Sequence, residues 1–161
     1  MKQQDSYRIC DMNSDFKIII PQKEQIHEIY EIEKLCFAHP QSEQSLLNDL
    51  NGNSVFFCCV CESGKVIGYI NADTVFDETY VVNVCVHPDY RRQGIGEGLV
   101  KALCEHCRDN LFSFVTLEVR QSNTAAISLY QKLGFEKAGL RKSFYTHPTE
   151  DADIMTLYFT N

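Results

Sequence analysis

Two arginines and three closely spaced glycines are the residues of this chain whose types and spacing best suit chemistry. Arg91 and Arg92 precede Gly94, Gly96 and Gly98, and a helical pattern begins at the glycines. Glycines let a ligand approach the backbone closely, and the first N–H groups of a helix have no partner within it. Because the helix dipole adds partial positive charge there, the segment predicts a site for a pyrophosphate group.

Two common phosphate-binding loops do not fit this spacing. The chain has no G-x-x-x-x-G-K-[ST] sequence, which excludes the P-loop of nucleoside triphosphatases. Its glycines follow G-x-G-x-G rather than G-x-G-x-x-G, so the dinucleotide-binding fingerprint is not met. A purely structural alternative to pyrophosphate binding stays open at this point. In it, the loop needs its glycines for flexibility and the arginines are surface charges.

A strand and a helix must position this loop. The apolar run Tyr80–Val86 predicts a buried strand, and Pro88 ends it because proline lacks an N–H and restricts the residue before it. After the loop, apolar residues recur every four positions and predict a helix over residues 94–108. These residues are Ile95, Leu99, Leu103 and Cys107.

The remaining segments predict a mixed α/β (α+β) domain. We expect strands over 16–20, 55–61, 66–76, 114–120, 135–144 and 153–159, and helices over 22–38, 42–50 and 124–133. An antiparallel meander therefore leads into strand–helix–strand–helix–strand around a mixed sheet. Residues 1–15 are expected to be a poorly ordered lead-in, and residues 16–161 a single domain.

Composition limits the class of protein. The chain has 161 residues, 44% of them hydrophobic, which suffices for one sizeable core. Its formal net charge of −7 argues against a nucleic-acid binder and is compatible with a cationic acceptor such as an amine. No run approaches the ~18 apolar residues of a membrane span, and the polar N-terminus does not resemble a secretory signal. We therefore expect a cytoplasmic protein without a membrane partner.

Eight cysteines are expected to be reduced thiols. Cys104 and Cys107 form a C-x-x-C within the predicted helix and share its apolar face, while Cys58, Cys59 and Cys61 lie in an apolar strand. A zinc site needs four ligands, usually from loops or turns. The pattern therefore predicts core cysteines and no metal.

The sequence carries two motifs of a known superfamily. R-x-x-G-x-G, at Arg91, Gly94 and Gly96, follows a strand ending V-x-V-x-P and resembles the acetyl-CoA pyrophosphate loop of the GNAT N-acetyltransferases. LEVRQSNTAAISLYQKLGF, residues 117–135, is similar to the RimI-like members, which acetylate the N-terminal alanine of a ribosomal protein. The resemblance covers residues 17–159 and implies the GNAT fold, with about seven strands and four helices. Gln41 departs from it, since RimI-like sequences usually carry an aromatic residue there.

The resemblance also implies roles for individual residues. The backbone of Val84, Cys85 and Val86 would pair with the pantetheine amides of acetyl-CoA and polarise its thioester carbonyl. Asn123 would hydrogen-bond pantetheine, Glu118 would be the base and Tyr130 the acid. The pyrophosphate would be held by Arg91, Arg92, Gly94, Ile95 and Gly96.

Each of these residues also has a purely structural explanation. In strand 114–120, alternation places Glu118 on the face opposite Val115, Leu117 and Val119, where it could be a solvated charge. Asn123 could serve as a helix cap alone. Tyr130 lies on the apolar stripe of its helix, where core packing is the default.

The implied function is transfer of acetyl from acetyl-CoA to a primary amine by direct attack in a ternary complex. The expected acceptor is a protein N-terminus, such as that of a small-subunit ribosomal protein. A small-molecule amine or lysine side-chain acetyltransferase is the alternative within enzymes. A non-catalytic module that binds acetyl-CoA is the alternative of another class.

Overall fold

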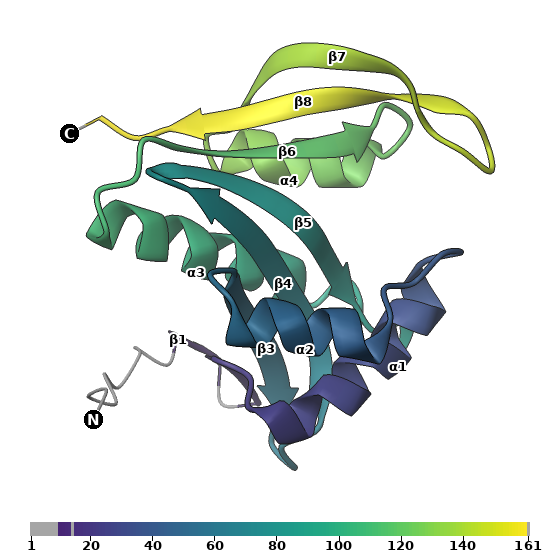
Figure 1. Cartoon of the computed structure of the whole chain (residues 1–161), viewed down its shortest axis with the longest axis vertical. Helices are drawn as coiled ribbons and strands as arrows, with labels where there is room; N and C mark the ends of the chain where they lie inside the picture. Colours follow the sequence, from purple (N-terminus) through teal and green to yellow (C-terminus); the bar gives the residue numbers. More distant parts are fainter. Residues whose placement is uncertain (1–9, 14, 161) are drawn as a thin grey trace. The chain divides into compact units, whose positions relative to one another are not determined.

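The structure, a computed structural model, describes residues 10–13 and 15–160. Within them eight strands form one mixed sheet in the order β1-β2-β3-β4-β5-β6-β8-β7, with four α-helices (Figure 1). The strands are β1 (Cys10–Asn13), β2 (Phe16–Ile19), β3 (Val55–Cys61), β4 (Val66–Val75), β5 (Glu78–Val86), β6 (Phe114–Arg120), β7 (Glu136–Tyr145) and β8 (Glu150–Tyr158). The helices are α1 (Ile26–Cys36), α2 (Glu43–Asn51), α3 (Ile95–Asp109) and α4 (Thr124–Lys132), with 3₁₀ turns η1 (Lys23–Gln25) and η2 (Pro88–Tyr90).

The predicted mixed α/β fold is confirmed, with one short strand beyond those expected. That strand, β1, lies in the segment 1–15, which was expected to be a poorly ordered lead-in. Residues 1–9 and Ser14 of this segment lie outside the described residues. The ladder between β5 and β6 is parallel, and the ladder between β6 and β8 is antiparallel. Among the described residues, no helix is long and apolar enough to cross a membrane.

The described chain divides into two compact units. The first contains residues through Asn71 together with Asn83–Leu103, and the second contains Ala72–Val82 and the residues from Cys104 onward. Strands β4 and β5 and helix α3 each contribute residues to both units. The single domain expected over residues 16–161 stays a prediction.

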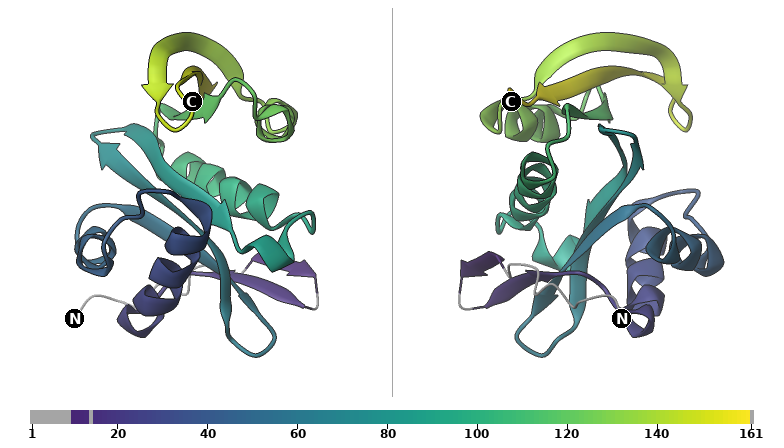
Figure 2. Two further views of the ribbon diagram at one scale, coloured as in Figure 1. Left: turned by 90° about the vertical axis from the view of Figure 1, so that its right-hand side faces the viewer. Right: turned by 60° about the vertical axis from the view of Figure 1, so that its left-hand side comes forward.

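In the first unit, helices cover both faces of the strands. Helices α1 and α2 lie on one face of β3 and β4, and the start of α3 lies on the other (Figure 2). The core between α1, α2 and the strands includes Ile29, Leu46, Phe56 and Tyr69. Helix α2 begins where the sequence predicts, because the Ser42 hydroxyl caps it by accepting the N–H of Ser45 at 3.0 Å.

In the second unit, β6 has the predicted alternation. Val115, Leu117 and Val119 are buried, whereas the residues between them are half-buried on the other face. Helix α4 ends before Gly134, whose φ of +97° lies in the left-handed region that favours glycine. Strand β8 begins at Glu150, three residues before the predicted start at Asp153.

Candidate active site

The predicted strand–loop–helix unit is present, and its loop lies in the first unit of the structure. The prediction that the strand is buried was wrong, because only Thr79 and Cys85 of β5 are buried, whereas Tyr80 and Val82 are 40% and 39% exposed. Strand β5 ends at Val86, the turn η2 follows, and the chain enters α3 at Ile95. Gly94 has a φ of +81°, and its carbonyl accepts the first helical hydrogen bond from Gly98 N at 3.0 Å. Glycine at 94 is therefore required by the backbone itself. The N–H groups of the first turn of α3 are the ones that can bind an anion.

Gly96 has a different reason to be glycine. A Cβ atom placed there would lie 3.8 Å from Val86 Cγ2, which is an ordinary van der Waals contact. The φ of Gly96 is not among the positive values of the chain. Packing within the described protein therefore leaves room for a methyl group at Gly96. A small residue at this point suits a ligand that occupies the same space.

Arg91 is turned toward the end of β5. Its Nε donates to the carbonyl oxygen of Val86 at 3.2 Å, and its Nη2 donates to Cys36 Sγ at 3.6 Å. Arg92 is exposed with a φ of +62°, and Ile95 is buried beneath the loop. The structure thus brings Val86, Arg91 and Gly96 together at one strand end, as the sequence predicts.

A buried carboxylate in the same unit was not predicted. Glu33 of α1 is 1% exposed. Its Oε1 accepts from the Tyr69 hydroxyl and from Asn83 Nδ2, the latter at 2.9 Å, and its Oε2 accepts from Gln41 N at 3.3 Å. Hydrogen bonds from three donors offset the cost of burying this group. The signal in the sequence was a charged residue on the apolar face of the helix, one residue after Ile32.

Gln41, the departure from the family pattern, joins this network. Its Oε1 accepts from Asn83 Nδ2 at 3.2 Å, and its Nε2 donates to Asp49 Oδ2 at 3.2 Å. Asn71 of β4 donates to the same Asp49 oxygen at 3.2 Å. The amide of Gln41 therefore ties the segment between α1 and α2 to β5 and to α2.

The second unit holds the proposed acid and base. Glu118, whose side chain is 28% exposed, accepts from Arg141 Nε at 3.1 Å. Tyr130 is 6% exposed, packs on Phe135 with ring centroids 5.7 Å apart, and has its pKa raised to about 12 by burial. Asn123 is a helix cap, because its Oδ1 accepts the N–H of Ala126 at 3.2 Å.

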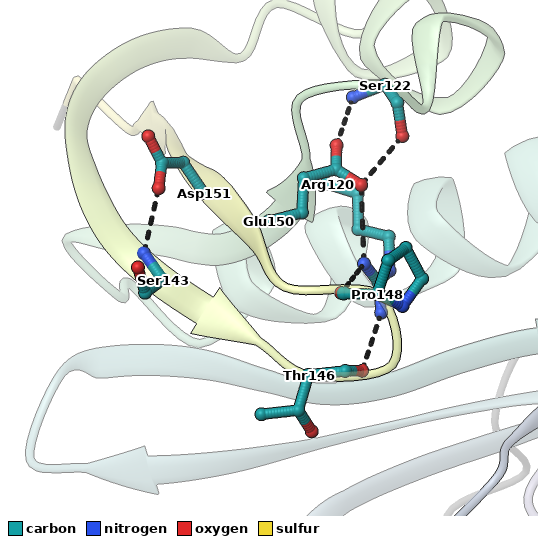
Figure 3. A network of polar contacts seen from close by, with 7 residues as sticks. All are labelled: Arg120, Ser122, Ser143, Thr146, Pro148, Glu150 and Asp151. Atoms are coloured by element: carbon teal, nitrogen blue, oxygen red, sulfur yellow. Dashed lines mark hydrogen bonds and ion pairs between the residues drawn. The ribbon is translucent and has the colours of Figure 1, made fainter.

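A polar network in this unit joins the turn after β6 to the turn between β7 and β8 (Figure 3). Arg120 donates to the carbonyl oxygens of Thr146 and Pro148 at 3.3 and 3.0 Å, and to Glu150 Oε1 at 3.3 Å. The Glu150 carboxylate accepts from Ser122 N at 2.6 Å and from the Ser122 hydroxyl at 2.9 Å. These bonds to Ser122, followed by Arg120, hold the pKa of Glu150 below its usual range.

Tyr145 is a residue near the proposed acid and base that the sequence did not single out. The Arg120 guanidinium carbon lies 4.3 Å from its ring centroid. Burial, followed by the negative charge of Glu118, raises the pKa of Tyr145. Tyr145 in turn contributes to the raised pKa of Tyr130, so its phenol is electrostatically linked to both groups.

Four of the five cysteines predicted to be core residues are buried. The prediction was wrong for Cys61, which is half-buried because it ends β3 beside the following turn, where it contacts Ser63. Cys58, Cys59, Cys104 and Cys107 are each less than 5% exposed, and burial raises the pKa of every one of these thiols. In the part of the chain that the structure describes, no group of three or more His, Cys, Asp or Glu side chains could hold a metal ion.

Comparison with known proteins decides the family. The model of the acetyltransferase (GNAT) family matches residues 24–135, which is more than half of the chain. The chain belongs to the GNAT acetyltransferase family. It is therefore an acyltransferase, and the resemblance inferred from its two motifs is confirmed.

Relatives and solved structures agree with this assignment. The [ribosomal protein bS18]-alanine N-acetyltransferase of Escherichia coli K12 is 37% identical over 130 residues, which cover 80% of this chain and 87% of the relative. The crystal structure of the E. coli ribosomal-protein-S18-alanine N-acetyltransferase matches with a TM-score of 0.83 and 33% identity, covering 91% of this chain and 95% of that one. Arabidopsis thaliana NAA60, solved in complex with acetyl-CoA, has the same fold at a TM-score of 0.81 and 17% identity, over 89% of this chain and 99% of that one.

Proposed function

We propose that this acetyltransferase moves acetyl from acetyl-CoA to the N-terminal α-amine of a protein, with a small-subunit ribosomal protein as the acceptor. The observation that carries the proposal is the glycine loop at the start of α3, where Gly96 keeps open a space that a methyl group would fill. The name of the 37% identical E. coli relative supports the acceptor class. The net charge of −7 suits a cationic acceptor.

In this proposal the first unit holds the cofactor. The N–H groups at Gly94, Ile95 and Gly96 donate to the pyrophosphate, and Arg91 and Arg92 add positive charge. The backbone of Val84, Cys85 and Val86 pairs with the pantetheine amides. The ladder between β5 and β6 joins Glu78–Tyr80 to Phe114–Thr116, so these three residues lie beyond its last rung.

The second unit supplies the proton chemistry. A free α-amine has a pKa of roughly 8, so near neutral pH much of it is protonated and cannot attack a thioester. We assign Glu118 as the base that takes this proton, directly or through a water molecule. Tyr130 then protonates the departing thiolate. Burial raises the pKa of this phenol, so it carries its proton near neutral pH. Asn123, whose amide oxygen caps α4, keeps its N–H₂ group for donation to pantetheine.

The acceptor is tested with matched peptides. Peptides that have a free N-terminus followed by basic residues should be acetylated at the α-amine by the protein and acetyl-CoA, as mapped by mass spectrometry. Because steering by net charge is screened, kcat/KM should fall as salt rises. Faster acetylation of N-terminally blocked peptides at internal lysine, or of free polyamines, would refute the proposed acceptor.

The cofactor site is tested with Gly96→Ala. The methyl group fits the described packing, and alanine suits a helix better than glycine, so the variant should fold with at least parental stability. Calorimetry should nevertheless show weaker acetyl-CoA binding, and Gly96→Val should weaken it further. Unchanged affinity in a folded Gly96→Val protein would refute the loop assignment.

A further inference from the structure

Three aromatic side chains form a row in the second unit, where β5 and β6 begin and β8 ends (Figure 1). Tyr80, Phe114 and Tyr158 are the members of this aromatic row. The ring centroid of Phe114 lies 5.9 Å from that of Tyr80 and 5.7 Å from that of Tyr158, with the rings edge to face. Tyr80 is 40% and Tyr158 is 67% exposed, and Phe114 is half-buried. Aromatic side chains that are exposed together are typical of a surface that binds a partner.

A carboxylate lies beside the aromatic row. Glu78 is directly opposite Phe114 in the parallel ladder, and Phe114 is directly opposite Tyr158 in the antiparallel ladder. Residues that are opposite each other in a ladder share one face of the sheet, so these three side chains lie on the same face. The Tyr80 hydroxyl donates a hydrogen bond to Glu78 Oε2, which holds the carboxylate beside the rings. Aromatic rings next to a negative charge favour a cation, and a guanidinium most of all.

The proposed base lies on the same face of β6. Phe114, Thr116 and Glu118 alternate with the buried Val115 and Leu117, so the three point to the other face of the strand. Phe114 and Glu118 are separated by about 13 Å, because a strand rises ~3.3 Å per residue. An extended peptide rises by a similar amount. A peptide whose first residue lies at Glu118 therefore reaches the aromatic row with about its fifth residue.

We propose that the aromatic row and Glu78 bind an arginine side chain at about the fifth residue of the acceptor, an inference that rests on the proposed function. The N-terminal amine of the acceptor lies at Glu118, and the acceptor continues in extended form along this face. The guanidinium of its arginine packs on the exposed rings and pairs with the Glu78 carboxylate. The aromatic row thus determines specificity for a basic N-terminal segment, and it takes no part in the transfer of acetyl.

Charge favours this occupant over a second copy of the chain. Two copies that met through their aromatic rows would bring two Glu78 carboxylates close together, in chains that each have a formal net charge of −7. Like charges across an interface oppose association. A basic segment is instead attracted both by Glu78 and by the net charge of the protein. The aromatic row therefore fits a cationic acceptor.

The first experiment moves a single arginine along a peptide substrate. Short peptides begin with a free alanine, are otherwise uncharged, and carry the arginine at one position from the second to about the eighth. For the parent protein, kcat/KM should be highest with arginine near the fifth position. Citrulline, a neutral analogue of similar shape, should lower it there by about 3- to 30-fold. The change should be in KM rather than in kcat, because the aromatic row does not touch the reacting atoms. An optimum clearly away from the fifth position, or equal rates with citrulline, would overturn the proposal.

The second experiment changes the site itself. Glu78→Gln should remove most of the preference for arginine over citrulline, and Tyr158→Leu, which keeps apolar bulk without an aromatic ring, should reduce it. Glu105→Gln is the matched control, because it removes the same charge from an exposed position of α3. This helix packs on the other face of β5, where Cys107 Sγ lies 3.4 Å from Thr79 Oγ1. The control should keep the parental preference. An equal loss in the control, or a parental preference in Glu78→Gln, would overturn the proposal.

The third experiment separates this site from the proposed function. Calorimetry compares the binding of the arginine and citrulline peptides to the parent and to Glu78→Gln, with CoA present. Tighter binding of arginine that depends on Glu78, without acetylation of the α-amine, would refute the proposed function and support the cation site. Acetylation of the α-amine with equal binding of both peptides would refute the cation site alone. A dimer that sedimentation detects in the parent but not in Tyr158→Leu would also overturn the proposal, since a second copy would then cover the row.

Discussion

Gly68 of β4 offers a direct test of how the cofactor loop is supported. This buried glycine lies beneath the start of α3, and a Cβ atom placed on it would meet three groups. It would lie 3.1 Å from the Cys85 carbonyl oxygen, 3.2 Å from Ile95 Cγ2 and 3.4 Å from Leu99 Cδ1. The first group is backbone of the strand that leads into the loop, and the other two are side chains of α3. We predict that the Gly68→Ala methyl group crowds these three groups, and that a shift of α3 relieves the strain.

The magnitude follows from two opposing effects. Adding a methyl group to a well-packed core destabilises the folded state by about 1–3 kcal/mol. Alanine also lowers the conformational entropy of the unfolded chain, which stabilises the protein by roughly 0.4–1 kcal/mol. The free energy of unfolding should therefore fall by up to about 2.6 kcal/mol, with a midpoint of about 1.3 kcal/mol. For a chain of this size that lowers Tm by about 2–4 °C per kcal/mol. If α3 must return to its parental position to bind acetyl-CoA, binding has to restore the strained contact. The free energy of binding is then less favourable by that strain, and each loss of about 1.4 kcal/mol raises Kd tenfold.

The measurements are denaturant unfolding, Tm and calorimetric binding of acetyl-CoA for the parent and the variant. Gly139→Ala in β7 is the matched control, because its added Cβ would meet the Ile154 Cδ1 methyl group at 3.3 Å, and this end of a side chain can move. The control should change stability by less than about 0.5 kcal/mol, as surface substitutions usually do, and should leave binding unchanged. A Gly68→Ala protein as stable as the control, with parental affinity, would refute the reasoning.

Three further variants test the second unit. Glu118→Gln should lower kcat by about 10²–10⁴-fold, the usual contribution of a general base, with little change in acetyl-CoA affinity. Tyr130→Phe should lower kcat similarly at small cost in stability, since the ring still packs on Phe135. If both variants turn over within about threefold of the parent, the acid and base assignments are wrong, and proximity and carbonyl polarisation are the sources of catalysis. Glu150 has a lowered pKa, so its stabilising contribution is complete above the usual carboxyl pKa and is lost as pH falls through the lowered value. Unfolding curves between pH 6 and about 2.5 should therefore be less acid-sensitive in Glu150→Gln than in the exposed control Glu136→Gln, and equal acid sensitivity would contradict this role.

Local patterns in the sequence predicted most of the secondary structure. The alternation of Val115, Leu117 and Val119 identified the buried face of β6, because side chains of a strand point to opposite faces at every second residue. The caps at Ser42 and Asn123 were predictable because a capping oxygen acts on an N–H three residues later. The glycine loop was equally local, since Gly94 is needed by its own backbone angle.

Contacts between distant segments had no such local signal. The sequence alone assigned no partner to Glu33, whereas the fold surrounds it with Tyr69 and Asn83 from two strands and with the backbone of Gln41. Such a network depends on which strands and helices pack together, and residue spacing along one element does not encode that.

The chemistry of individual groups was likewise decided by tertiary structure. Cys36 and Arg91 are 55 residues apart in the chain, yet their side chains are in contact and the pKa of Cys36 is lowered. Glycine at 68 was visible in the sequence, but its reason lies in the carbonyl oxygen and the α3 side chains above it. Residue type and periodicity therefore determined the elements, and the resemblance of two motifs to known sequences indicated the family. Burial and charge around each side chain arise only when segments far apart in sequence come into contact, and these set its reactivity.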